Sequence, residues 1–270
     1  MTILQAIILG IVQGATEFLP ISSSGHLVLV PELLNWELRE DVTFVFDVLV
    51  QWGTLFAVFI YYWKDLTEIT KATIQGVLNR KPFETFYARL GWLLVLATIP
   101  AVILGLLLKD TVEAAFKTAT PTAYFLLLTA ALLIFAERVG KRTRTVEDIT
   151  WKDALIIGFF QVMALFPGVS RSGSTIAGAM TRDLERPAAA RFSFLMSVPV
   201  ILGAGIVSTF DLLATPDIGS FIVPLLVATA VSAVVGYIAI RWLIAFLSKY
   251  PLYGFAVYVV FASIVLFLSI

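Results

Sequence analysis

Long apolar runs follow one another along almost the whole chain, separated by short polar segments. A helix that crosses the hydrocarbon core of a bilayer needs about 20 mostly apolar residues. Six runs reach or come close to that length: Val42–Trp63, Leu90–Leu108, Pro121–Ala136, Phe192–Leu213, Phe221–Leu247 and Leu252–Ile270. The pattern therefore predicts an all-α integral membrane protein with six transmembrane helices.

Four shorter apolar runs occur in two pairs, and each pair is interrupted by proline. The first pair, Ile3–Leu19 and Ile21–Leu34, is broken at Pro20, and the second, Ala154–Phe166 and Val169–Met180, at Pro167–Gly168. At 1.5 Å per residue, a run like Ala154–Phe166 covers only about 20 Å. We therefore predict two re-entrant helical hairpins, whose broken tips must be buried in protein or line a wet cavity.

The two hairpins share a sequence pattern at an offset of 148 residues. Six identities fall in a short window: Gly10 with Gly158, Gln13 with Gln161, Phe18 with Phe166, Ser22 with Ser170, Ser24 with Ser172, and Gly25 with Gly173. A weaker match at an offset of 131 pairs Ala97, Thr98 and Gly105 with Ala228, Thr229 and Gly236. One hairpin and three spans per half predict a single membrane domain, residues 1–270, built from inverted repeats over about 1–136 and 149–270.

Composition supports the membrane assignment and removes other classes. The chain is 59% hydrophobic and 14% charged, with no cysteine and a formal net charge of zero. The absence of cysteine excludes a disulfide-stabilised scaffold. The zero net charge argues against a nucleic-acid-binding protein, which would normally carry an excess of basic residues. Fifteen of the 19 lysines and arginines are expected on one side, 13 of them in loops 64–89, 137–153 and 181–191 and two, Arg241 and Lys249, bordering the last turn. Arg39, Lys109 and Lys117 are expected on the other side. This asymmetry predicts that both termini face outward.

The first hairpin contains the carboxylate and the imidazole that stand out in so apolar a chain. Glu17 follows Gln13 by four residues, so that both lie on one helical face. His26, the one histidine, ends the segment Ser22–His26, in which three serines and a glycine precede it. A carboxylate with a neighbouring amide can hold a divalent cation, and a histidine near a serine can act as base or nucleophile.

The second hairpin tip contains an arginine among hydroxyl groups and glycines. Arg171 lies in the segment Pro167–Thr175, which also contains Ser170, Ser172, Gly173 and Thr175. The guanidinium fork matches phosphate oxygens bidentately, and the N-terminus of a helix after the break attracts anions. Together the two tips predict a site for a phosphorylated substrate and phosphoryl transfer to water.

The sequence also allows purely structural roles for the same residues. Glu17 could form an ion pair with Arg171 that only stabilises the fold, and His26 could be an interhelical hydrogen-bond partner. Ser22, Ser23 and Ser24 could cap a helix or fill a close contact between helices, and Gln13 could be a core amide. The segment from Glu137 to Arg144 is typical of a solvated face, and the aromatic residues are typical of lipid-facing positions.

Two strings carry a resemblance to a known family: QGATEFLPISSSGH at 13–26 and PGVSRSGST at 167–175. Both resemble the undecaprenyl-diphosphatase, or bacitracin-resistance, family, and the hydrophobic layout agrees over nearly the full length. The resemblance implies a bacterial inner-membrane phosphatase that converts undecaprenyl diphosphate to undecaprenyl phosphate and inorganic phosphate. It also implies recycling of the carrier lipid for peptidoglycan synthesis, bacitracin resistance, a divalent cation (magnesium or calcium) and a site that opens to the outer face.

The resemblance also implies residue roles. Glu17 corresponds to a metal-binding carboxylate, and Gln13 stands where many members have a second Glu. Ser23 and His26 correspond to the nucleophile and the base. We expect Ser23 to be the nucleophile and His26 its base, and the reverse arrangement, with direct attack by His26, stays open. Arg171, with Ser170, Ser172, Thr175, Ser22 and Gly173, would bind the diphosphate. The inverted repeat leaves open an alternative function as a transporter or flippase for an anionic lipid, and the sequence leaves open whether the protein is a homodimer.

Overall fold

The computed structural model describes residues 1–36, 40–116, 118–213 and 219–270. Within these ranges the regular structure is helical, and the one β-type pairing is an isolated bridge between Arg144 and Leu184. Arg39 and Lys117, two of the cations expected on the outer side, lie outside the described residues. The helical class predicted from the apolar runs is confirmed.

Fourteen helices follow one another in the described ranges. The elements are α1 (Ile3–Thr16), α2 (Ser23–Leu33), α3 (Glu40–Leu49), α4 (Gln51–Tyr61), α5 (Trp63–Leu78), α6 (Phe86–Leu107), α7 (Lys109–Phe116), α8 (Ala119–Val139), the 3₁₀ turn Val146–Asp148, α9 (Trp151–Met163), α10 (Arg171–Thr181), α11 (Arg186–Leu213), α12 (Gly219–Leu247) and α13 (Tyr253–Ser269).

Four of these helices are long and apolar enough to cross a bilayer. They are α6, α8, the part of α11 from Arg186 to Phe210, and the part of α12 from Phe221 to Leu247. The first predicted span is divided at Val50 into α3 and α4, and α5 turns away from α4 by 82°. The sixth, α13, is apolar but only 17 residues long. The structure therefore has four candidate spans, or five if the bent pair counts as one, which establishes a multi-pass membrane protein.

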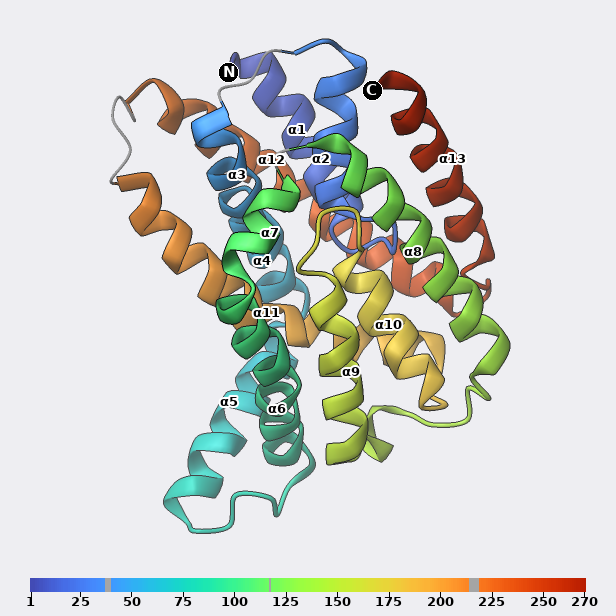
Figure 1. Cartoon of the computed structure of the whole chain (residues 1–270). Coiled ribbons are helices and arrows are strands. Elements are labelled where there is room, and N and C mark those ends of the chain that lie inside the picture. The colour runs from blue at the N-terminus through green and yellow to red at the C-terminus, as the bar shows by residue number, and fades with distance from the viewer. Residues whose placement is uncertain (37–39, 117, 214–218) are drawn as a thin grey trace.

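The two interrupted segments form two helical hairpins that approach each other from opposite ends of the molecule. In Figure 1, α1 descends from the end that carries both termini and α2 returns, whereas α9 ascends from the other end and α10 returns. Their tips touch: the Ser172 hydroxyl donates to the Leu19 carbonyl at 3.0 Å, and the Gly168 amide donates to Ser24 Oγ at 3.3 Å. This contact brings together the two motifs that are far apart in the sequence.

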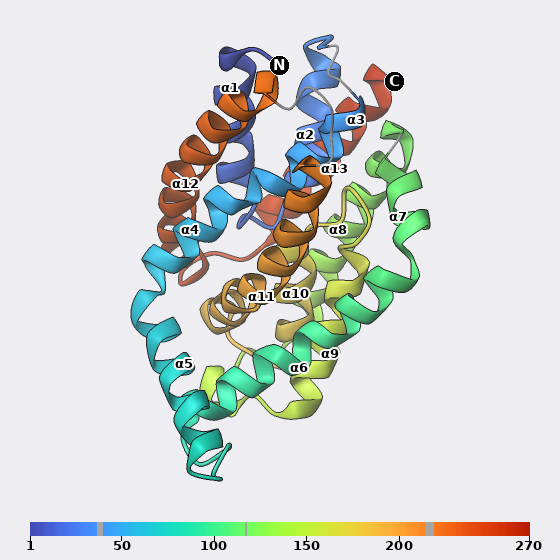
Figure 2. The ribbon, with the colours of Figure 1, turned by 90° about the vertical axis from the view of Figure 1, so that its left-hand side faces the viewer.

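Small residues at equivalent positions let each hairpin pack closely on a long helix. A Cβ on Gly10 of α1 would lie 2.6 Å from the Ala228 carbonyl oxygen on α12. A Cβ on Gly158 of α9 would lie 2.4 Å from the Ala97 carbonyl oxygen on α6. Glycine is required in both places because a methyl group cannot fit at these distances. The view in Figure 2 shows α1 beside α12 at one side and α9 beside α6 at the other.

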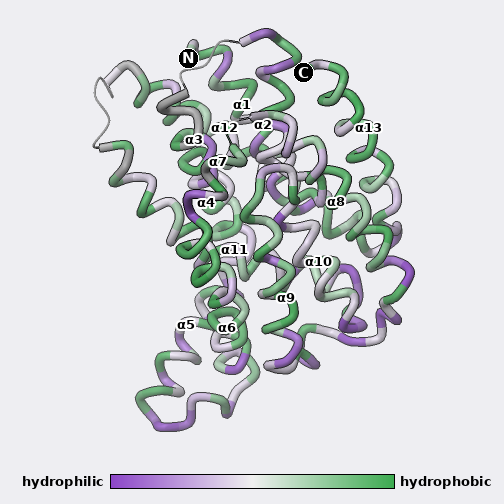
Figure 3. The backbone as a smooth tube through the Cα atoms, in the orientation of Figure 1, coloured by the Kyte–Doolittle hydropathy of each residue, from purple (hydrophilic) through white to green (hydrophobic). Residues whose placement is uncertain are grey.

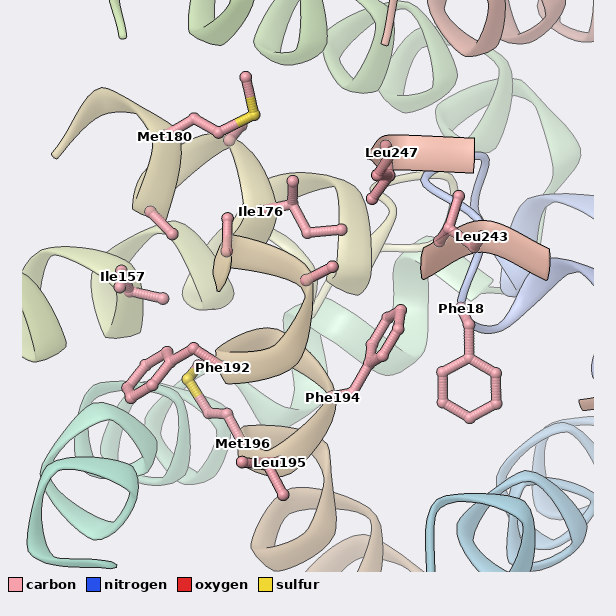
Figure 4. Close-up of a cluster of buried hydrophobic side chains, with 14 of the residues drawn as sticks. Phe18, Ile157, Ile176, Met180, Phe192, Phe194, Leu195, Met196, Leu243 and Leu247 are labelled. Atoms are coloured by element: carbon pink, nitrogen blue, oxygen red, sulfur yellow. The ribbon is translucent and has the colours of Figure 1, made fainter. Parts of the chain in front are cut away.

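The core lies where the tip of the first hairpin meets α10 and α11. Phe18 and Phe194 meet edge to face with ring centroids 5.1 Å apart, and both are fully buried. Figure 4 shows Phe192, Leu195 and Met196 of α11 among the buried side chains of the same cluster. This packing fixes the position of Glu17, because Phe18 follows it directly in the chain.

Hydrophilic residues gather at the end opposite the termini, on α5 and on the loops beside α8 to α10 (Figure 3).

The expectation that Glu137 belongs to a solvated face is wrong: Glu137 is 5% exposed. Its carboxylate accepts bonds from Arg186 Nε at 2.7 Å, Arg142 Nη2 at 2.8 Å and the Leu252 amide at 2.8 Å. Arg142, in the loop that follows α8, and Arg186 at the start of α11 neutralise the charge, and the contact with Arg186 is one that the local sequence pattern does not reveal.

Candidate active site

Glu17 is the centre of a buried hydrogen-bond network at the end of α1. The side chain is 5% exposed and receives three donors. Gln13 Nε2 donates to Oε2 at 2.9 Å, Ser23 Oγ donates to Oε2 at 2.7 Å, and an Arg171 nitrogen donates to Oε1 at 2.8 Å. The helical spacing expected for Gln13 and Glu17 is thus confirmed, and the carboxylate joins both hairpins.

Arg171 begins α10, directly after the tip of the second hairpin. Its Nη2 pairs with Glu17 and its Nη1 donates to the Ser193 carbonyl at 3.4 Å. Within the described residues these are its partners, so three of its five N–H donors stay available to a ligand. The side chain is 13% exposed. Arg171 therefore combines a fixed position with spare donors of the geometry that phosphate oxygens require.

Ser23 and His26 lie on the first turn of α2 but contact different groups. The Ser23 hydroxyl donates to Glu17, whereas His26 Nδ1 lies 2.8 Å from the Ser22 carbonyl oxygen. His26 Nε2 lies 2.8 Å from the Tyr258 hydroxyl on α13. In this structure the group placed to accept the Ser23 proton is the carboxylate of Glu17, and no hydrogen bond joins Ser23 to His26.

Ser22 and Ser170 form matching caps at the starts of α2 and α10. The Ser22 hydroxyl accepts the Gly25 amide at 3.2 Å, and the Ser170 hydroxyl accepts the Gly173 amide at 3.0 Å. Each capping oxygen lies 3.2 Å from the hydroxyl two residues on, which belongs to Ser24 or Ser172. The capping interpretation is thus confirmed for Ser22, and Ser170 caps α10 in the same way.

The tip of the second hairpin is fixed by α8. Gly168 has a φ of 95°, and a Cβ there would lie 2.3 Å from the Thr122 carbonyl oxygen. Thr129 Oγ1 donates to the Gly168 carbonyl and accepts the Ser170 amide, both at 2.9 Å. The backbone therefore needs glycine for both its conformation and its surroundings, and this arrangement sets where α10 and Arg171 begin.

Thr175, on the first turns of α10, also stabilises the start of this helix. Its Oγ1 donates to the Arg171 carbonyl at 2.7 Å and lies 2.6 Å from the Ser193 hydroxyl. Thr175 is fully buried. Thr175 thus anchors Arg171 to α11. Nothing in the local sequence around Ser193 distinguishes it, so the sequence does not predict this contact.

Tyr258 is the other residue that the sequence did not reveal. It was grouped with the lipid-facing aromatics, yet its hydroxyl contacts His26 from a helix 232 residues away in the chain. No feature of the α13 sequence separates Tyr258 from Tyr253, which shares its helix. Only the packing of α13 on α2 identifies it.

Oxygen atoms suitable for a hard cation are present beside Glu17. Gln13 is fully buried, and its Oε1 has no hydrogen-bond partner among the described residues. Within the described residues, no group of three or more His, Cys, Asp or Glu side chains is arranged so that it could hold a metal ion. Mg²⁺ is commonly bound by one or two carboxylates together with phosphate oxygens of the substrate. One carboxylate with a neighbouring amide oxygen fits a cation that arrives with, or is completed by, a phosphorylated ligand.

Comparison with known proteins agrees with the two motifs. The family described as "Bacitracin resistance protein BacA" matches residues 6–265. The chain belongs to this family. Among curated relatives, a protein of Chloroherpeton thalassium is 44% identical, with 96% of this chain and 93% of the relative covered. A protein of Chlorobium phaeovibrioides is also 44% identical (99% and 97%), and one of Thermomicrobium roseum is 39% identical (100% and 99%).

All three relatives carry the name undecaprenyl-diphosphatase. The aligned regions include both hairpin tips, since they extend over nearly the whole chain. The family assigned from 13–26 and 167–175 is therefore confirmed.

Proposed function

We propose that this protein hydrolyses undecaprenyl diphosphate to undecaprenyl phosphate and inorganic phosphate. It thereby returns the carrier lipid to peptidoglycan synthesis and confers resistance to bacitracin. The observation that carries the proposal is the meeting of Glu17 and Ser23 with Arg171 at the joined hairpin tips, in a chain whose relatives bear the name of this activity. A phosphoryl-transfer site needs a positioned nucleophile and fixed positive charge, and both are present here.

Arg171 binds the diphosphate in this scheme. Its spare N–H donors hold oxygens of the terminal phosphate, and the amides at the start of α10 add the positive end of the helix. Ser172 and Gly173 line this start, while Ser170 and Thr175 keep it in place through the cap and the Arg171 carbonyl. Ser22 and Gly25 provide the equivalent support on the first hairpin.

Ser23 is the nucleophile that the geometry favours. Its oxygen attacks the terminal phosphorus, its proton passes to Glu17 at 2.7 Å, and the bond to the bridging oxygen breaks. Undecaprenyl phosphate leaves with the bridging oxygen, and water then cleaves the phosphoserine to release inorganic phosphate. The pairing of Ser23 with His26 as base, and direct attack by His26, stay as alternatives. Trapping of the phosphoenzyme separates direct attack by His26 from attack by Ser23.

A divalent cation, magnesium or calcium, would complete the site. Glu17 and the free oxygen of Gln13 would hold it. When bound, the cation neutralises phosphate charge and polarises the phosphoryl oxygens. Ser23 and Arg171 perform their own roles beside it.

The proposed membrane arrangement has six crossings and two re-entrant hairpins in inverted repeats of about 1–136 and 149–270. The equivalent contacts of Gly10 with Ala228 and of Gly158 with Ala97 support the repeat. Both termini lie at one end, and the polar loops lie at the other (Figures 1 and 3). With the arginine- and lysine-rich loops in the cytoplasm, the termini and the first hairpin open to the outer face of the bacterial inner membrane.

Phosphate release from undecaprenyl diphosphate tests the function. Purified protein in detergent with Mg²⁺ should release inorganic phosphate, and excess chelator should stop the release. Undecaprenyl monophosphate serves as the control substrate. No release from the diphosphate with Mg²⁺ or Ca²⁺ would contradict the proposal.

Lipid translocation is the second candidate function, because hairpins that meet from opposite sides are typical of transporters. The same protein in liposomes, with labelled undecaprenyl diphosphate in one leaflet, separates the two functions. Movement of intact lipid without phosphate release would favour translocation.

A further inference from the structure

Tyr258 contacts the histidine of the site from the opposite end of the chain. Its hydroxyl lies 2.8 Å from His26 Nε2, and the two rings are parallel within 6°, with centroids 5.6 Å apart. His26 itself is buried, whereas Tyr258 is 43% exposed. Tyr258 therefore connects the buried imidazole to the exposed face of α13.

The other contact of the ring decides which nitrogen carries the proton. His26 Nδ1 lies 2.8 Å from the Ser22 carbonyl oxygen, which can only accept a hydrogen bond. Nδ1 must therefore be protonated, and in the neutral imidazole the lone pair is on Nε2. The Tyr258 hydroxyl then donates to Nε2.

Backbone geometry fixes the first of these two contacts. Ser22 has a φ of 71°, in the left-handed region that non-glycine residues seldom adopt. This conformation belongs to the cap of α2, where the Ser22 side chain accepts the Gly25 amide. The carbonyl of Ser22 is thus held by the same turn that positions Ser23, and the imidazole bridges this turn to α13.

We propose that Tyr258 is a positioning residue that holds His26 in the Nδ1-protonated tautomer, with its Nε2 lone pair directed toward α13 and away from Ser23. Tyr258 acts through His26. The effect that we expect on kcat rests on the proposed phosphatase function. It accounts for the absence of a Ser23–His26 bond, because both imidazole nitrogens are already engaged.

Substitution Tyr258→Phe isolates the hydroxyl, since the ring and its parallel stacking stay. Tyr253→Phe is the matched control: Tyr253 lies on the same helix, is 42% exposed and makes no hydrogen bond through its hydroxyl within the described residues. Two readouts apply to each variant, the imidazole ¹⁵N spectrum and the separate kcat and KM values for undecaprenyl diphosphate.

The spectrum needs no assignment, because His26 is the one histidine of the chain. Protein labelled with ¹⁵N-histidine should show one imidazole pair, with Nδ1 protonated and Nε2 unprotonated. Tyr258→Phe should shift the Nε2 signal or mix the two tautomers, because one hydrogen bond to Nε2 is lost. Since the imidazole ties the turn that positions Ser23 to α13, the variant should also lower kcat about tenfold with little change in KM. Tyr253→Phe should change neither readout.

An unchanged imidazole spectrum in Tyr258→Phe would overturn the inference, and so would a shifted spectrum with wild-type kcat. A wild-type protein that releases no phosphate would instead refute the proposed function. The spectrum would still test the contact in that case, so the two failures are distinguishable.

Discussion

The Glu17 carboxylate and the Arg171 guanidinium lie 2.8 Å apart although 154 residues separate them in the sequence. Their contact joins the tips of two hairpins that approach from opposite ends of the molecule. Both side chains are shielded from solvent, and an unpaired charge there would cost several kcal/mol. The pair therefore stabilises the junction and also holds the arginine fork beside the Ser23 hydroxyl.

Replacement of Arg171 by lysine tests whether the pair does more than stabilise. Arg171→Lys keeps the charge but removes the fork, so we expect kcat/KM for undecaprenyl diphosphate to fall about 100-fold. The exposed Arg241 provides the control, and Arg241→Lys should retain activity. Near-normal turnover in Arg171→Lys would contradict the assignment of the phosphate-binding role.

A charge swap separates the two roles of the same pair. Glu17→Arg with Arg171→Glu can restore an ion pair between the tips, and we expect the melting temperature to recover relative to either single variant. Activity should stay absent, because the carboxylate no longer lies beside Ser23. Phosphate release at the wild-type rate from the double variant would show that the pair is only structural.

Replacement of Gly168 by alanine tests the conformation of the second tip. The methyl group would meet the Thr122 carbonyl at 2.3 Å in a left-handed backbone, so Gly168→Ala should destabilise the protein by about 1–3 kcal/mol. The measurement is thermal unfolding in detergent. Gly203→Ala on α11 is the control, because nothing lies within 4 Å of a Cβ there and the change should be neutral or mildly stabilising. Equal effects of the two substitutions would refute the account of the tip.

Asp153, at the polar end of α9, predicts a pH dependence of stability. Burial opposes its ionisation, but hydrogen bonds from Arg144, Arg182 and Thr150 outweigh burial and hold the pKa of this carboxyl well below its ordinary value of 3.8. A depressed pKa in the folded state gives stability that is present above pH 3.8 and is lost as the pH falls below it.

We therefore expect Asp153→Asn to lower the melting temperature at pH 7. The difference from wild type should shrink as the pH falls below 3.8. Glu68→Gln, at an exposed position of α5, should show no such trend. A difference that stays constant across this range would contradict the role of the two arginines.

The sequence predicts the helical class, the two hairpins and most of the site because each depends on local signals. Proline breaks mark the tips, and Glu17, His26 and Arg171 stand out because charge is costly in apolar segments. The hydroxyl groups of Ser22 and Ser170 follow from their positions before helix starts.

Other features depend on tertiary contacts that no local pattern contains. The acceptor for Ser23 is Glu17 because the chain reverses at Pro20, and the partner of His26 is a tyrosine on the last helix. Glu137 is buried because Arg186 of α11 and Arg142 of the loop after α8 both contact its carboxylate. The sequence shows only the neighbours of these side chains along the chain. In the folded protein their contacts come from residues that are distant in the sequence.

The nucleophile can be identified by trapping the phosphoenzyme. With undecaprenyl diphosphate labelled in its terminal phosphate, acid quenching should recover label in an acid-stable form, as phosphoserine at Ser23. Acid-labile label on His26 would instead support direct attack by the imidazole. The Ser23→Ala variant should trap no label.

The most direct test of the central claim is the initial rate of phosphate release from undecaprenyl diphosphate by Ser23→Ala, beside wild type and Ser248→Ala. Ser248 is exposed, and within the described residues its hydroxyl bonds only to the Ile244 carbonyl, so its variant should keep the wild-type rate. The account predicts that Ser23→Ala loses at least about 100-fold in rate while the melting temperature is kept. A folded Ser23→Ala variant with the wild-type rate would contradict the placement of the chemistry at the joined tips.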